Sequence, residues 1–132
     1  RLRLTYELQG AGVLWVTAEG DFEGPWPESV PRIGLRLTLP GALDCATWYG
    51  RGPGESYPDS KEACAVGLWS LGVDSLYTPY IFPQENGSRS DVQWASLRDA
   101  AGMGMLVVGE PDFAAWFPAE GGWLSKILSW LR

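Results

Sequence analysis

Apolar side chains recur at every second position along most of the chain, which is the period of a β-strand with one face toward a core. The first alternating segment spans residues 2–8, and a glycine-rich turn connects it to a second over 13–19. These two segments predict a β-hairpin. Alternation is clearest over 33–39. A further strand is expected over 43–49, as the hairpin partner of 33–39.

The second half of the chain continues with short strands and turns. A strand is expected over 63–71, after a long loop rich in Gly and Pro, and 91–97 with 103–109 predict another hairpin. Prolines interrupt residues 77–87, so we expect an ordered edge segment or a loop there, because proline is excluded from central strands. This spacing of strands and turns predicts an all-β fold, an antiparallel β-sandwich in one domain over 1–132.

The C-terminal segment GGWLSKILSWLR follows a different period. Its apolar residues fall at helical spacing: Trp123, Leu124, Ile127, Leu128 and Leu131. This pattern predicts a short C-terminal amphipathic helix over about 122–131. A helix of about three turns is marginal alone, so it must pack on something.

Three roles are open to this helix. It covers an apolar face of the sandwich, it lies on a membrane surface, or it packs against another copy to form a homodimer. The membrane role ranks lower, because Lys126 and Arg132 are the only cations of the segment and the whole chain is acidic. We therefore expect the helix to cap the sandwich.

Composition narrows the class of protein. The net charge of −6 disfavours nucleic acid, whose phosphates repel an acidic chain. No run of about 18 apolar residues is present, so a membrane partner is not expected. The N-terminal RLRLTYEL has neither Met nor a signal-peptide core, which predicts a fragment or trimmed form and leaves the compartment open. The 8 Trp residues fit either core packing or a platform that stacks on sugar rings.

Few residues are available for catalysis. The chain has no His, which excludes Ser-His-Asp and Cys-His mechanisms, and two cysteines alone cannot complete a zinc site. We expect Cys45 and Cys64 to be buried free thiols, and we expect no metal and no cofactor. The carboxylates in or beside the loops are Glu55, Asp59, Glu62, Glu85 and Asp91. No motif places two of them about 5–5.5 Å apart, as a retaining glycosidase requires, so no catalytic residue is assigned.

Three stretches of unusual composition occur in a fixed order. They are PRIGL over 31–35, WYGRGPGESYPDS over 48–60 and YTPYIFPQENGSRSDVQW over 77–94. In this order they resemble the C-terminal β-sandwich domain of glycoside hydrolase family 2 β-galactosidases. The resemblance runs from about Leu4 to about Val108, and it divides the chain into a family-like part over 1–109 and a divergent tail over 110–132.

The resemblance implies a large antiparallel supersandwich of the galactose-mutarotase type, here in shortened form. In that family the catalytic glutamates lie in a separate (β/α)₈ barrel that the sandwich abuts, which implies that this chain alone is not an enzyme. A Trp from the family's C-terminal region helps to form the galactose pocket. The divergent tail does not match that region, so this role is not carried over to Trp116, Trp123 or Trp130. The resemblance also implies a cytoplasmic protein.

A polar and aromatic run in the third stretch forms the candidate substrate-binding surface. Its residues are Tyr80, Phe82, Gln84, Glu85, Asn86 and Arg89. Amides and carboxylates hydrogen-bond sugar hydroxyls and an aromatic ring covers a sugar face, which indicates a surface that faces a galactoside or another domain. The alternative is structural: Asn86-Gly87 makes a turn, and the polar side chains bind the loop backbone.

Three hypotheses for function are kept. The first is a non-catalytic C-terminal domain or fragment of a bacterial β-galactosidase, which supports the catalytic barrel and the galactoside pocket and has the catalytic domain or a galactoside as its partner. The second is a stand-alone carbohydrate-binding module. The third is a shortened or engineered β-sandwich scaffold with no role in sugar binding.

Overall fold

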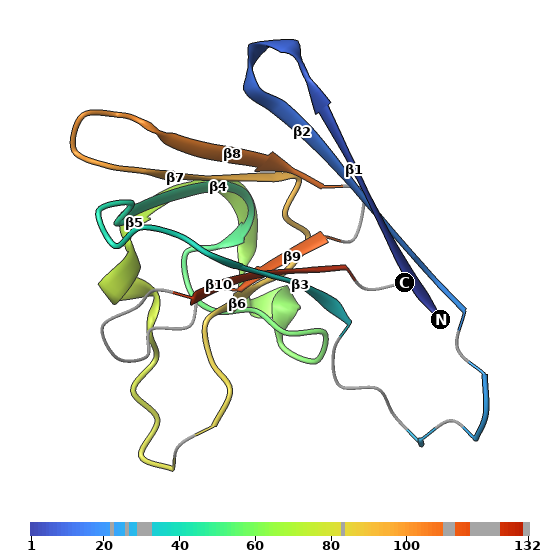
Figure 1. Ribbon diagram of the computed structural model, residues 1–132. Coiled ribbons are helices and arrows are strands. Elements are labelled where there is room, and N and C mark those ends of the chain that lie inside the picture. Colours follow the sequence, from blue (N-terminus) through green and yellow to red (C-terminus); the bar gives the residue numbers. More distant parts are fainter. Residues whose placement is uncertain are drawn as a thin grey trace. The chain divides into compact units, whose positions relative to one another are not determined.

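The computed structural model describes the backbone and side chains of residues 1–21, 23–25, 27–28, 33–82 and 84–109, and the backbone strands 113–116 and 125–130. The fold of these residues is all-β, as predicted, and its strands pair antiparallel (Figure 1). Helical segments within the described ranges are short 3₁₀ turns. None of them approaches the length and hydropathy of a membrane-crossing helix.

The described residues form ten strands and three 3₁₀ turns. The strands are β1 (Leu2–Gln9), β2 (Val13–Gly20), β3 (Gly34–Thr38), β4 (Cys45–Gly52), β5 (Ala65–Gly72), β6 (Ser88–Arg89), β7 (Trp94–Arg98), β8 (Gly104–Val108), β9 (Phe113–Trp116) and β10 (Ser125–Trp130). The turns are η1 (Gly10–Gly12), η2 (Lys61–Ala63) and η3 (Val73–Leu76).

The chain forms two compact units, Arg1–Pro31 and Arg32–Arg132. The first contains the predicted hairpin, in which β1 and β2 pair from Leu2↔Gly20 to Gln9↔Val13. The connecting turn η1 requires positive φ at Ala11 (64°) and Gly12 (77°). A two-stranded hairpin has no second layer of its own in which to bury its apolar side chains, so it depends on packing elsewhere for stability.

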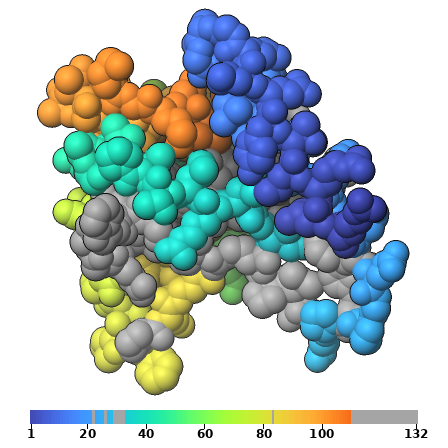
Figure 2. All heavy atoms as spheres, in the orientation of Figure 1, coloured from blue at the N-terminus to red at the C-terminus, as the bar shows by residue number. Residues whose placement is uncertain are grey.

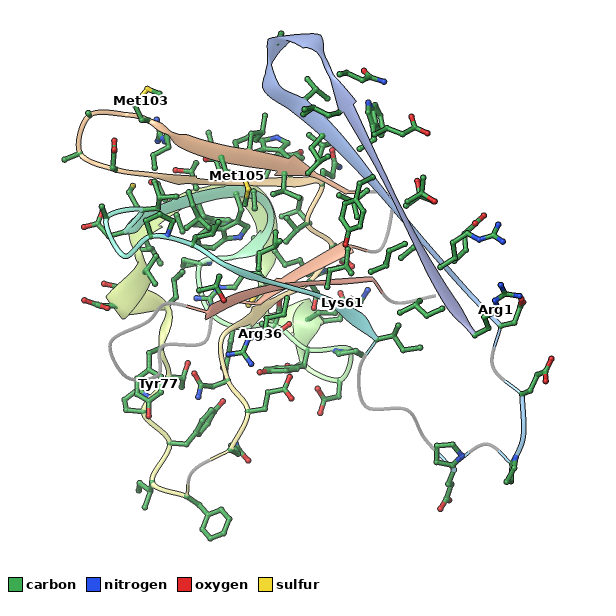
Figure 3. All side chains as sticks on the ribbon, in the orientation of Figure 1. Arg1, Arg36, Lys61, Tyr77, Met103 and Met105 are labelled. Carbon is green, nitrogen blue, oxygen red and sulfur yellow. The ribbon has the colours of Figure 1, made fainter. Side chains whose placement is uncertain are left out.

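The second unit contains two four-stranded sheets, with the orders β3-β10-β9-β6 and β5-β4-β7-β8 (Figure 1). The predicted hairpin of 91–97 with 103–109 is confirmed as β7 and β8. Figure 3 shows Met103 at the turn of that hairpin. Residues 77–87 contain no strand among those described, which agrees with the expected loop.

The expected pairing of 33–39 with 43–49 is wrong. β3 pairs with β10, whereas β4 pairs with β5 and β7 in the other sheet. The chain crosses from one sheet to the other after Pro40, where Leu43 N–H donates to the Pro40 carbonyl in a turn. Proximity in sequence favours a hairpin between these two segments. Leu39 and Leu43 both pack against the core, however, and a chain that crosses from one sheet to the other buries both side chains.

The predicted helix over about 122–131 is wrong for residues 125–130, which form β10, while its other residues lie outside the described ranges. β10 pairs with β3 on one side and β9 on the other. Hydrogen bonds to two strands outweigh those of a short helix that is marginal alone. The cap, membrane and dimer roles expected of a helix therefore do not apply to this segment. The tail instead supplies the two central strands of its sheet.

The core lies against one face of the β5-β4-β7-β8 sheet. Trp48 on β4 is completely buried, and the side chains packed with it are Ala46, Val73, Leu76, Val92, Ala95 and Leu97. Leu39, Leu43, Trp69, Leu71 and Val107 extend this cluster as half-buried neighbours. Each fully buried large side chain of this kind stabilises the fold by about 1.5–3 kcal/mol.

Two glycines on β4 lie where neighbouring residues approach the strand closely. An added Cβ would lie 2.8 Å from the Val92 Cα at Gly50, and 2.6 Å from the Trp69 ring at Gly52. The Trp69 indole N–H also donates to the Gly50 carbonyl at 3.1 Å. The backbone of β4 therefore approaches its neighbours more closely than any side chain allows.

We predict that Gly50→Ala lowers the free energy of unfolding by about 1–3 kcal/mol, because the new methyl group would overlap backbone atoms that cannot move aside. Gly54→Ala is the matched control, since an added Cβ there meets nothing within 4 Å. Urea unfolding of the two variants and the parent chain tests this. Equal stability of all three proteins would contradict the close packing at Gly50.

Candidate functional site

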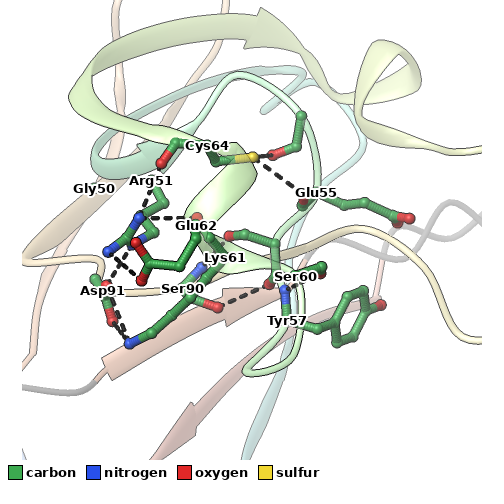
Figure 4. A network of polar contacts seen from close by, with 12 residues as sticks. Gly50, Arg51, Glu55, Tyr57, Ser60, Lys61, Glu62, Cys64, Ser90 and Asp91 are labelled. Carbon is green, nitrogen blue, oxygen red and sulfur yellow. Dashed lines mark hydrogen bonds and ion pairs between the residues drawn. The ribbon is translucent and has the colours of Figure 1, made fainter.

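The stretches 48–60 and 77–94, which carried the sequence resemblance, meet beyond the end of β4. The Ser56 N–H donates to the Ser88 carbonyl at 2.8 Å, and the Ser90 N–H donates to the Ser56 hydroxyl at 2.8 Å. The Ser90 hydroxyl donates in turn to the Ser56 carbonyl at 2.8 Å (Figure 4). Ser56 is buried, so these bonds fix the two stretches together inside the protein.

Arg51 is the centre of a charged cluster that joins three segments. Its Nε donates to the Asp91 carboxylate at 2.6 Å and its Nη2 to Glu62 at 3.2 Å. Its Nη1 donates to the carbonyl oxygens of Lys61 (2.8 Å) and Cys64 (3.0 Å). The Lys61 ammonium lies 3.1 Å from Asp91, which is therefore held by two cations (Figure 4).

The hydrogen bond from Arg51 lowers the pKa of Asp91, and Lys61 acts in the same direction against the opposing effect of desolvation. The same bond raises the pKa of Arg51. Asp91 also adopts a positive φ of 54°, a conformation in which Asp and Asn are among the few common side chains. Both charge and backbone geometry therefore fix Asp91 in a structural role.

Arg89 on β6 is a buried cation, with 2% of its surface exposed. Its guanidinium stacks on the Trp48 ring at 5.4 Å from the centroid, and it donates to the carbonyl oxygens of Pro53 (3.0 Å) and Leu76 (3.3 Å). Its Nε has no hydrogen-bond partner among the described residues. Desolvation by burial lowers its pKa, and the negative charge of Glu55 opposes that effect.

Glu55 and Asn86 order the loop over 77–87. One carboxylate oxygen of Glu55 accepts from the Tyr80 hydroxyl, and the other accepts from the Gly87 N–H at 2.9 Å. The Asn86 side chain accepts from the Thr78 N–H and donates to the Gln84 carbonyl, each at 3.2 Å. Gly87 has a φ of 89°, which suits the glycine of the expected Asn-Gly turn.

The six candidate substrate-binding residues thus occupy two different environments. Tyr80, Phe82, Gln84 and Glu85 are exposed on the 77–87 loop, with 83% of Phe82 accessible. Asn86 is half-buried and hydrogen-bonded to the loop backbone, and Arg89 lies in the interior. The four exposed residues lie on the loop, whereas Asn86 contacts the loop backbone and Arg89, on β6, contacts the interior.

The Arg51–Lys61–Asp91 cluster was not found from the sequence, although Asp91 was weighed as a carboxylate. Its members lie far apart in the chain, and no local spacing connects them. Cys45 and Cys64 are free, as expected, but each is half-buried rather than buried. Within the described ranges, no three residues of the metal-binding types lie close enough to hold a metal ion.

We predict that Asp91→Asn lowers stability by at most about 1 kcal/mol above pH 5, because the change removes the charge from a partly exposed ion pair and keeps the positive φ. The pKa of Asp91 is lower in the folded chain, so its stabilising effect is present above the ordinary value of 3.8 and is lost as the pH falls through the folded value. Denaturant unfolding between pH 2 and 6 (about two units on either side of that value) tests this.

Glu62→Gln is the control for the same series. The Glu62 side chain is mostly exposed, so the stability difference from the parent should stay small and flat across the pH range. A difference for Asp91→Asn that does not narrow in acid would show that its ionisation does not stabilise the fold.

Comparison with known proteins places this chain in a family. The chain matches the family described as Beta galactosidase small chain over residues 1–120, beyond the Val108 limit of the resemblance. It is 38% identical over 108 residues to a β-galactosidase of Priestia megaterium (82% of this chain) and 40% identical over 111 residues to that of Pseudoalteromonas haloplanktis (83%). It is 43% identical over 102 residues to that of Lactobacillus delbrueckii subsp. bulgaricus (76%). The chain spans about 10% of the length of these relatives.

The chain therefore corresponds to a domain-sized part of β-galactosidases, and it belongs to the β-galactosidase small chain family.

Proposed function

We propose that this chain is a non-catalytic C-terminal β-sandwich part of a bacterial β-galactosidase, which supports the catalytic barrel and the galactoside pocket. The two antiparallel sheets suit the supersandwich that the resemblance implies. The short span of the match, about 10% of each relative, supports a domain that acts as part of a larger enzyme.

The observation that carries the proposal is that three of the five motif carboxylates bind neighbouring groups of the fold. Glu55 accepts from Tyr80 and Gly87, Glu62 pairs with Arg51, and Asp91 pairs with Arg51 and Lys61. A glycosidase needs one carboxyl group with a raised pKa as acid and a second as nucleophile or base. Asp91 has its pKa shifted in the opposite direction. These groups fix loops, and their chemistry is that of a scaffold.

A galactoside or the catalytic domain is the partner proposed for the 77–87 loop. Phe82 offers an exposed ring, and Tyr80, Gln84 and Glu85 are exposed on the same loop. An aromatic ring of this kind covers the apolar face of a sugar, and the polar groups reach its hydroxyls. Asn86 and Arg89 are assigned the supporting role of holding the loop in place.

The first test is the activity of the purified chain on a chromogenic galactoside. We expect no turnover above background, because the catalytic carboxylates are proposed to lie elsewhere in the enzyme. Turnover that survives repurification and disappears on Glu55→Gln or Asp91→Asn would refute the non-catalytic assignment.

The second test places the chain in a whole enzyme. The matching segment of the Pseudoalteromonas haloplanktis β-galactosidase is replaced by this chain, and kcat and KM are measured. We expect the chimera to hydrolyse galactoside, whereas the same enzyme with the segment deleted should be inactive. An inactive but folded chimera would count against the proposed role.

The exposed Phe82 supports a carbohydrate-binding module as the second candidate. We expect the isolated chain to bind free galactose only weakly, with a Kd of about 1 mM or more, since about −4 kcal/mol is what a few contacts on an open loop supply. Titration followed by Trp fluorescence measures this, with Phe82→Ala as the comparison. Micromolar affinity that Phe82→Ala abolishes would favour the binding module instead.

A further inference from the structure

The β5-β4-β7-β8 sheet has an unusual outward face. Strand register places Leu68, Tyr49, Trp94 and Val108 side by side, one from each of its four strands. We call this row, with Val66 on β5 and Leu106 on β8, the apolar stripe. Exposed fractions are 64% for Leu68, 36% for Tyr49 and 71% for Val108. The orange residues of β8 are visible on the surface in Figure 2.

The next row on the same face is polar at three of its four positions, and Leu106 of the stripe is the fourth. Register places Ser70, Thr47 and Ser96 beside one another. The Thr47 and Ser70 hydroxyls lie 2.9 Å apart, and the Arg98 guanidinium donates to the Thr47 hydroxyl at 3.3 Å. An outward sheet face that meets water ordinarily carries such residues along its whole length.

The other side of the stripe is bounded by the charged cluster. Arg51 follows Tyr49 on the same face of β4 and pairs with Asp91, while Val66 lies opposite Arg51 on β5. The stripe is therefore an apolar band between a hydroxyl-rich row and a group of ion pairs. An apolar centre within a polar rim is the anatomy of a protein–protein interface.

We propose that the apolar stripe is the surface on which this domain docks against the rest of the β-galactosidase polypeptide. This inference rests on the proposed function and names the contact face. The relatives are about ten times longer than the matched segment, so most of the enzyme is protein available to cover the face. A second copy suits the stripe less well, because each chain has a net charge of −6 and two copies repel.

The test uses the Pseudoalteromonas haloplanktis chimera that carries this chain. Leu68→Ser with Val108→Ser makes both edges of the stripe polar without touching the core. We expect at least a tenfold loss of galactosidase activity and faster proteolysis at the segment junctions, because truncated anchor residues release the domain. In the isolated chain the same pair should leave the melting temperature within about 2 °C of the parent.

Met103→Ser is the control, since Met103 is an exposed apolar residue outside both the stripe and the 77–87 loop. This control should keep the activity of the parent chimera. An active parent chimera that is indifferent to the stripe variant would overturn the inference and leave the proposed function standing. An inactive parent chimera would count against both the inference and the proposed function. Light scattering gives the oligomeric state of the isolated chain. If the parent chain is a dimer and the stripe variant is a monomer, the face binds a second copy and the inference is overturned.

Discussion

The buried contact between Arg89 and Trp48 is the constraint on which the second unit depends. A guanidinium in the interior has lost its water, and here the groups that replace water are two backbone carbonyls and an indole face. Those carbonyls belong to Pro53 and Leu76, which lie on different segments. Burial of the Arg89 charge is costly without these two carbonyl groups. The segments that carry Pro53 and Leu76 must therefore be folded in place when β6 takes its position in the sheet.

Two further groups of contacts join the same segments. Ser56 and Ser90 are also buried and join the two motif stretches through backbone and hydroxyl groups. Arg51 and Asp91 are partly exposed and close the outer side. Motifs that suggested a binding site in the sequence thus serve largely to hold two loop segments together. The exposed positions within these motifs are the ones available to bind a partner.

The sequence predicted the strands and loops well where residues close in sequence determine them. Alternation located both hairpins, and the prolines of 77–87 identified a loop. Pairing across the sheets could not be read in the same way, because β3 could find a partner in any apolar strand. The tail shows the limit: Ile127 and Leu128 fit a helical stripe and a strand equally, and only the presence of β3 and β9 decides between them.

The residues of the candidate site also differ in how well the sequence predicted them. Tyr80 and Phe82 are exposed on the loop where the sequence placed a candidate binding surface. Arg89 was grouped with them because it belongs to the same polar and aromatic run of the sequence. Its burial depends on Trp48, Pro53 and Leu76, which are distant in sequence and brought together only by the fold.

The order of strands in the β3-β10-β9-β6 sheet has a consequence for synthesis on the ribosome. β3 emerges early, yet its neighbour in the sheet is β10, near the other end of the chain. Until that segment has left the exit tunnel, β3 has an open edge and its sheet lacks a centre. Such long-range pairing is slow and exposes unpaired strands to other nascent chains. The strands of the β5-β4-β7-β8 sheet are close in sequence, so this sheet can form first. It can bury core residues before the β3-β10-β9-β6 sheet is complete.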